Sequence, residues 1–346
     1  MRLLIGLLAI AIVLSAGCAP AVTPAAQPTG PGTLYVVNEA SGNISVIDTA
    51  VNKVADTITV EGNPKGIALS PDGKILYVTL GDQNSVAVVE AGSNQVVASI
   101  PVGADPQAIA VSRDGKRGYV TNYESSDVTV LNLESRKSLA SIKVGTNPQA
   151  IALSYDGATA YVVNLRSNNV SALETTTGRV KATIPAGEGP CGISLTADGR
   201  YAYVGGHGGM GGATPMKGMD GAGGKDAAQK AGPNRDMRVL DLDTKEQVGS
   251  VTCGVMPVAM VLTPSARAYV ANHGSNEVSV VDLSSRNVIS TIPVGKNPSG
   301  IVLSKDGRRV YVSSRDAAEV SVIDDGSMKV VATVPVGEEP RGMAIK

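Results

Sequence analysis

The sequence contains no phenylalanine and no tryptophan, so its ten tyrosines are the only large aromatic residues. A hydrophobic core must therefore come mainly from Val, Ile, Leu and Ala. Val and Ile are β-branched and favour strands over helices. The 40 glycines and 19 prolines among 346 residues indicate frequent turns. This composition predicts an all-β protein built from many short strands.

The sequence also lacks an excess of charge of either sign, because 30 basic and 31 acidic residues leave a net charge of −1. A protein that binds polyanions carries an excess of basic residues. Neither a Gly-x-Ser-x-Gly elbow nor a Cys-x-x-Cys-His haem attachment motif is present. With two histidines in the whole chain, acid–base catalysis would depend on one of them or on scattered carboxylates such as Glu39, Asp82 and Glu124. We therefore expect a non-enzymatic protein.

The N-terminus has the features of an export signal. Arg2 precedes an apolar run from Leu3 to Leu14, which is too short for a comfortable membrane span. The small residues before Cys18 resemble a bacterial lipobox, which implies removal of residues 1–17 and lipidation of Cys18. Residues 18–32 are rich in Pro, Ala, Thr and Gly and are predicted to form a tether. We expect a protein anchored by lipid to the cell envelope, in the outer membrane or periplasm if the cell has two membranes.

Two markers recur along the rest of the chain, and both occur seven times. A proline in a Val-Gly-x-x-Pro context, or in a close variant of it, recurs with steps of 42, 42, 42, 67, 41 and 42 residues. Its copies are Pro64, Pro106, Pro148, Pro190, Pro257, Pro298 and Pro340. A Tyr-Val pair begins at Tyr35, Tyr77, Tyr119, Tyr161, Tyr203, Tyr269 and Tyr311. A period near 42 with four strand patterns per unit is typical of propeller blades.

The unit at 61–102 predicts four strands, A to D, at 64–70, 75–80, 85–90 and 95–102. The chain ends complete the count, because 33–60 supplies strands B, C and D and 337–346 supplies only an A strand. Together they make one blade, so 33–346 is predicted to be a seven-bladed β-propeller closed by its C-terminal strand. Closure also removes an exposed sheet edge.

These repeats resemble a known family. The residues Tyr-Val-Val-Asn at Tyr35, Tyr-Val-Thr-Asn at Tyr119 and Ser-Pro-Asp-Gly at Ser70 are similar to the YVTN repeat of YncE-like bacterial envelope and surface-layer propellers. The resemblance implies the propeller fold, but one fold hosts many functions. It also suggests nucleic acid as a partner, which we do not expect because the top loops mix both charges.

The long step of 67 residues places about 25 extra residues in one B–C loop, at 205–236. Gly and Ala dominate this segment, so it is predicted to be flexible. It contains His207, Met210, Met216 and Met219.

The two histidines occupy the same repeat position, four residues after the marker tyrosine, in neighbouring blades. Cys191 follows a marker proline and Met256 precedes the next one, so both belong to top-face loops of the same blades. Imidazole, thiolate and thioether together suit copper. The hypothesis is a copper site formed by His207, His273, Cys191, Met256, Met210, Met216 and Met219. The alternative is that duplication explains the histidines and that Cys191 is a small packed residue.

Cys191 and Cys253 are predicted not to form a disulfide. They belong to the first and last strands of one blade, roughly 14 Å apart at about 4.8 Å per strand. A disulfide tolerates a Cα separation of only about 7 Å. Cys253 replaces a repeating valine, so we expect it to serve packing.

The sequence thus favours a binding or scaffolding module, expected to be monomeric, that receives an envelope protein or a small ligand on its top face. A propeller enzyme of the lactonase or dehydrogenase-associated type is the alternative.

Overall fold

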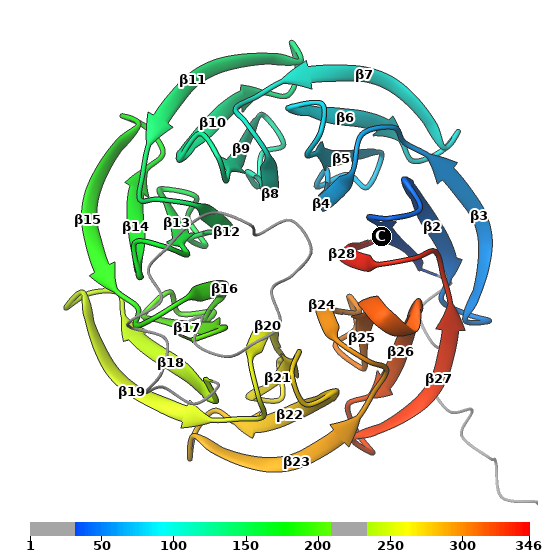
Figure 1. Ribbon diagram of the computed structural model, residues 1–346, viewed down its shortest axis with the longest axis vertical. Coiled ribbons are helices and arrows are strands. Elements are labelled where there is room, and N and C mark those ends of the chain that lie inside the picture. Colours follow the sequence, from blue (N-terminus) through cyan, green and yellow to red (C-terminus); the bar gives the residue numbers. More distant parts are fainter. Residues whose placement is uncertain (1–31, 209–233) are drawn as a thin grey trace, which may run out of the picture. The chain divides into compact units, whose positions relative to one another are not determined.

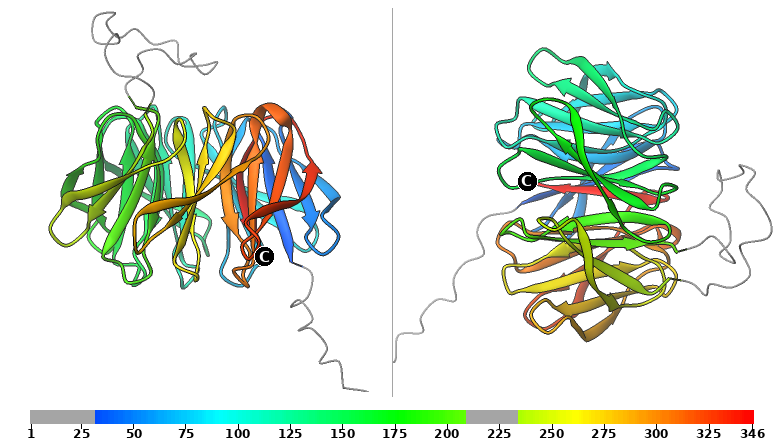
Figure 2. Two further views of the ribbon diagram at one scale, coloured as in Figure 1. Left: turned by 90° about the horizontal axis from the view of Figure 1, so that it is seen from below. Right: turned by 90° about the vertical axis from the view of Figure 1, so that its left-hand side faces the viewer.

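The computed structural model describes residues 32–208 and 234–346. The predicted signal at 1–17, most of the tether at 18–32, Cys18, Met210, Met216 and Met219 lie outside these residues. Within them, 28 strands form seven four-stranded antiparallel sheets arranged as blades around an axis (Figure 1). Figure 2 shows this ring of blades from the side. The predicted all-β, seven-bladed propeller is confirmed. None of the described residues forms a helix that is both long and apolar enough to cross a membrane.

Each blade runs from an inner strand at the axis to an outer strand at the rim. The first blade consists of β28 (Pro340–Ile345), β1 (Thr33–Asn38), β2 (Asn43–Asp48) and β3 (Lys53–Thr59). The second and third are β4 (Pro64–Leu69), β5 (Ile75–Leu80), β6 (Ser85–Glu90), β7 (Gln95–Pro101), and β8 (Pro106–Val111), β9 (Arg117–Asn122), β10 (Asp127–Asn132), β11 (Lys137–Lys143). The fourth and fifth are β12 (Pro148–Leu153), β13 (Thr159–Asn164), β14 (Asn169–Glu174), β15 (Arg179–Pro185), and β16 (Pro190–Leu195), β17 (Tyr201–Gly206), β18 (Asp236–Asp241), β19 (Glu246–Thr252). The sixth and seventh are β20 (Pro257–Leu262), β21 (Arg267–Asn272), β22 (Glu277–Asp282), β23 (Asn287–Pro293), and β24 (Pro298–Leu303), β25 (Arg309–Ser314), β26 (Glu319–Asp324), β27 (Lys329–Pro335).

The hydrophobic core lies between neighbouring blades rather than in one central mass. The middle strands, such as β5 and β6, are buried on both faces, whereas the outer strand β7 is mostly exposed. In one core layer, Val88 of the second blade packs with Val120 and Leu131 of the third. Each blade is therefore stabilised by its neighbours, which explains why small β-branched residues suffice.

The C-terminal strand closes the ring. β28 pairs antiparallel with β1, with Leu34 opposite Ile345 and Val36 opposite Met343. Met343 packs in a layer that also contains Tyr311 of the seventh blade. The two ends of the propeller domain are therefore joined in one blade, as the repeat count predicts.

One turn recurs at the top of every blade and fixes the positions that line the axis. The residue before the marker proline has a positive φ in all seven copies: Asn63, Asp105, Asn147, Gly189, Met256, Asn297 and Glu339. Its carbonyl oxygen accepts a hydrogen bond from the amide four residues after the marker tyrosine. In the fifth and sixth blades these amides belong to His207 and His273, each 2.9 Å from its acceptor. The backbone therefore holds both histidines beside the start of an inner strand.

Cys191 and Cys253 are both buried and do not form a disulfide, as predicted. Cys253 is 8% exposed and packs with Tyr203 and Met237 in a core layer, which confirms its packing role.

Candidate functional site

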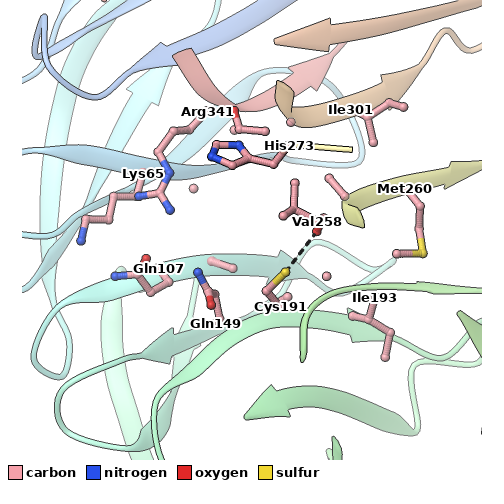
Figure 3. Close-up of a pocket in the computed structure, with 18 of the residues that line it drawn as sticks. Lys65, Gln107, Gln149, Cys191, Ile193, Val258, Met260, His273, Ile301 and Arg341 are labelled. Atoms are coloured by element: carbon pink, nitrogen blue, oxygen red, sulfur yellow. Dashed lines mark hydrogen bonds between the residues drawn. The ribbon is translucent and has the colours of Figure 1, made fainter. Parts of the chain in front are cut away.

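The propeller axis contains a cavity of about 280 Å³. All seven inner strands contribute to its wall, and three residues that follow second strands, His207, His273 and Arg315, complete it. Figure 3 shows this cavity with its lining side chains. Because every blade reaches the axis, this is the one place where all seven repeats can act on a single ligand.

Two repeat positions determine the chemistry of the wall. The residue directly after each marker proline lines the cavity in all seven blades: Lys65, Gln107, Gln149, Cys191, Val258, Ser299 and Arg341. The residue four positions after each marker tyrosine is Glu39, Gly81, Tyr123, Leu165, His207, His273 or Arg315. The backbone repeats while these side chains differ, so each sector of the cavity has its own character.

One end of the cavity, here called the soft end, is formed by Cys191, His207 and His273. The ring centres of the two histidines are 6.5 Å apart and their planes are at 89°. His273 Nδ1 lies 3.3 Å from the carbonyl oxygen of Pro298. If Nδ1–H donates to this carbonyl, the lone pair of Nε2 remains free, which is the usual arrangement of a histidine that binds a metal.

Both imidazoles are neutral near pH 7. Burial, with smaller contributions from His273 and Arg341, lowers the pKa of His207 to about 4. Burial also lowers the pKa of His273, with smaller contributions from Arg315 and Arg341. His207 Nδ1 is buried without a hydrogen-bond partner among the described residues, so Nε2 is the nitrogen left to contact a ligand.

The thiol of Cys191 is protonated. Burial raises its pKa to about 12, and its Sγ lies 3.7 Å from the carbonyl oxygen of Val258 (Figure 3). A thiol in such surroundings is not a reactive nucleophile. It can become a metal ligand only by losing its proton to the incoming ion.

The other predicted ligands are placed differently. Met256 does not line the cavity; it occupies the positive-φ turn position, where its carbonyl oxygen accepts from His273. Met260 does line the cavity. The equivalent residues of the other blades are all large and apolar: Ile67, Ile109, Ile151, Ile193, Ile301 and Met343. Met260 also packs in the core layer between the fifth and sixth blades, with Tyr203 and Val239. Within 32–208 and 234–346, no three His, Cys, Asp or Glu side chains gather closely enough to hold a metal ion. The copper site stays a prediction.

The part of the cavity wall contributed by the second, first and seventh blades, here called the basic end, carries Lys65, Arg341 and Arg315. Lys65 Nζ is 2.5 Å from Asp105, and Arg341 Nη1 is 3.2 Å from both carboxylate oxygens of Glu39. Arg315 contacts Glu39 at 3.1 Å and Glu339 at 2.5 Å.

The sequence reasoning did not anticipate this network, because it treated these charges as ordinary loop residues. The two repeat positions would have revealed it, because alignment on the proline gives Lys65 and Arg341, and alignment on the tyrosine gives Glu39 and Arg315.

A second and more polar chamber, of about 440 Å³, adjoins the basic end. The two spaces share Lys65, Gln107, Gln149, Arg315 and Arg341. The wall of this outer chamber also contains acidic residues, namely Glu39, Asp82, Asp105 and Glu124. The basic side chains thus separate an acidic outer chamber from the axial cavity.

Known proteins resemble this chain mainly in fold. Hydrazine synthase of Kuenenia stuttgartiensis is similar with a TM-score of 0.73 and 22% identity over 84% of this chain and 92% of that one. A functionally unknown protein from Desulfotomaculum acetoxidans gives 0.74 and 16%, over 90% and 98% of the two chains. The dihydro-heme d1 dehydrogenase NirN gives 0.63 and 16%, over 90% and 74%. At these identities the likeness shows the fold alone, and no curated protein matches the sequence.

The profile of the YNCE-like beta-propeller family matches residues 82–159 and 235–345, which together make up more than half of the chain. The repeats with their marker proline and tyrosine, the seven blades and the closing strand agree with this match. The chain therefore belongs to the YncE-like β-propeller family.

Proposed function

We propose that this chain is a non-catalytic binding propeller of the cell envelope that holds Cu(I) at the soft end of its axial cavity. The observation that carries the proposal is the pair of neutral imidazoles. His273 uses Nδ1 on the Pro298 carbonyl, and His207 has an unpartnered, buried Nδ1, so each ring has Nε2 available for a ligand.

The spacing of the two rings fits a metal with few ligands. Metal–nitrogen bonds of about 2.0 Å place the ring centres of two coordinating imidazoles at most about 6.4 Å apart, when the three atoms are in line. The observed 6.5 Å is close to this limit, so the spacing of the rings is compatible with a near-linear complex. Cu(I) accepts such low coordination and favours soft ligands, and Cys191 supplies a thiol in the same wall.

Binding is favoured over acid–base catalysis by the protonation states. A general base works best with a pKa near the working pH. The pKa of His207 is held near 4, which suits a lone-pair donor rather than a group that cycles protons at neutral pH. The two similar enzymes named above share the fold only, and their activities are not carried over to this chain.

The predicted lipid anchor at Cys18 and the following tether support an address at the envelope. A propeller held there presents the loops of its top face to a partner protein or to a small ligand. Labelling with a fatty-acid analogue in cells, compared between the native chain and Cys18→Ala, tests the anchor directly.

Competition with a chromophoric Cu(I) chelator under anaerobic conditions tests the metal site. We expect one Cu(I) per chain, with binding at least tenfold weaker in His207→Ala and in His273→Ala. Tyr123→Ala changes the same repeat position two blades away from His207 and is the matched control. Equal affinity in the native protein and both histidine variants would rule out the imidazole site.

A further inference from the structure

The wall of the axial cavity is cationic, although the protein as a whole is nearly neutral. Lys65, Arg315 and Arg341 line the cavity, and no Asp or Glu is found among the described residues that line it. Their partners Glu39 and Asp105 line the outer chamber instead. A ligand in the cavity therefore meets the basic groups directly and the carboxylates only behind them.

Donors remain available at the basic end. Both contacts of Arg341 with Glu39 use Nη1, which leaves Nη2 and Nε of the guanidinium for another acceptor. The ammonium of Lys65 has three donors, of which the Asp105 contact uses one. Figure 3 shows Lys65, Gln107 and Arg341 on one side of the cavity, with Val258 and Ile301 on the other. This geometry suits the two oxygens of a carboxylate.

Charge and polarity restrict the ligand further. The three bases are already balanced by three carboxylates, those of Glu39, Asp105 and Glu339. A bound monoanion adds one uncompensated charge to a partly buried site, whereas a dianion adds two at much greater cost. The facing wall contains the apolar side chains of Ile193, Val258 and Ile301, which suit hydrocarbon.

We propose that the axial cavity binds a short-chain monocarboxylate, with its carboxylate between Lys65 and Arg341 and its tail against Val258 and Ile301. The carboxylate site uses Lys65 and Arg341 of the basic end and the copper site uses His207 and His273 of the soft end, so different side chains carry the two sites. It assigns a second ligand class to the cavity, which the family relationship and the similar structures do not supply.

Isothermal titration of the metal-free, full-length protein with acetate, butyrate and sulfate tests this proposal. We expect one butyrate per chain and an affinity that rises about fourfold for each methylene added to acetate. Lys65→Met is expected to weaken binding at least tenfold. Lys74→Met removes another lysine that is paired with an aspartate, at 3.7 Å from Asp72 on the exposed surface, and is expected to leave binding unchanged.

A circular dichroism melt shows whether Lys65→Met is folded, and Gln149→Leu is a second variant at the basic end that leaves the ion pairs intact. The proposal is overturned if neither carboxylate binds saturably, if folded Lys65→Met and Gln149→Leu both bind like the native protein, or if sulfate binds more tightly than butyrate. Cu(I) competition on Lys65→Met separates the two sites, because copper affinity is expected to remain at the native value.

Discussion

Met343 provides a sharp test of how the propeller closes. It lies in β28, is 7% exposed, and packs in the layer between the first and seventh blades. Met260 has the same position in the repeat, is also 7% exposed, and lies in a blade that is continuous in sequence. Shortening a buried Met to Ala costs about 2–5 kcal/mol, from lost transfer free energy and the cavity left behind. We therefore expect Met343→Ala and Met260→Ala to lower the free energy of unfolding by similar amounts.

The assay is urea denaturation followed by far-UV circular dichroism, since the chain has no tryptophan to report unfolding by fluorescence. Val331→Ala, at a side chain that is 50% exposed on the outer strand β27, serves as the surface control and is expected to change stability by about 0.5 kcal/mol or less. If Met343→Ala behaves like Val331→Ala while Met260→Ala is strongly destabilising, the terminal strand does not seal the ring and the reasoning is refuted.

Two further predictions concern the axial site and the repeat. The pKa of His207 is about 4 when folded and about 6.5 when unfolded, so below pH 6.5 the unfolded state takes up a proton that the folded state excludes. Stability should therefore fall by up to about 3 kcal/mol between pH 6.5 and pH 4 in metal-free protein. Urea titrations should show that the free energy of unfolding of His207→Gln falls by that much less over the same pH range. If the native protein and His207→Gln lose the same stability between pH 6.5 and pH 4, His207 is not buried as described. A Cβ on Gly145 would lie 2.6 Å from Cγ of the buried Asn164, whereas one on Gly92 would meet nothing within 4 Å. Gly145→Ala should thus cost about 1–3 kcal/mol and Gly92→Ala far less, which thermal melts of the two variants can compare.

The fold was predictable because its determinants recur at fixed spacing. A buried asparagine after the marker tyrosine, such as Asn164, donates to Asn169 and Ser171 of the next strand. The glycine of the Val-Gly-x-x-Pro sequence packs directly over that asparagine, which leaves no room for a side chain at Gly145. The two markers are therefore parts of one packing unit, and a sequence that preserves both specifies a blade. Seven copies, with one divided between the chain ends, specify the ring.

The axial site was only partly predictable, because residues come together there by the closure of the ring and not by proximity in sequence. His207, His273 and Cys191 all line the axial cavity, because the histidines share one repeat position in adjacent blades and Cys191 begins the inner strand of the blade that carries His207. Glu39 and Arg341 are about three hundred residues apart, and their contact exists only because the terminal strand joins the first blade. Met256 was selected because it precedes a marker proline, but it does not line the cavity. It occupies the positive-φ position of the turn instead.

The backbone of this propeller and the side chains at its axis are set by different residues. The backbone at the axis is fixed by the recurring turn, by the packing of glycine over the buried asparagine and by the core layers between blades. The side chain directly after the marker proline and the side chain four residues after the marker tyrosine can therefore vary without loss of the fold. In this chain the two positions supply cysteine and histidine in the fifth and sixth blades and basic residues in the seventh, first and second blades. The two ends of the cavity therefore differ in the chemistry of their side chains while they share one backbone frame. If the proposed sites are correct, substitution at these two positions per blade would change the ligand of the propeller, and binding experiments on this chain should begin there.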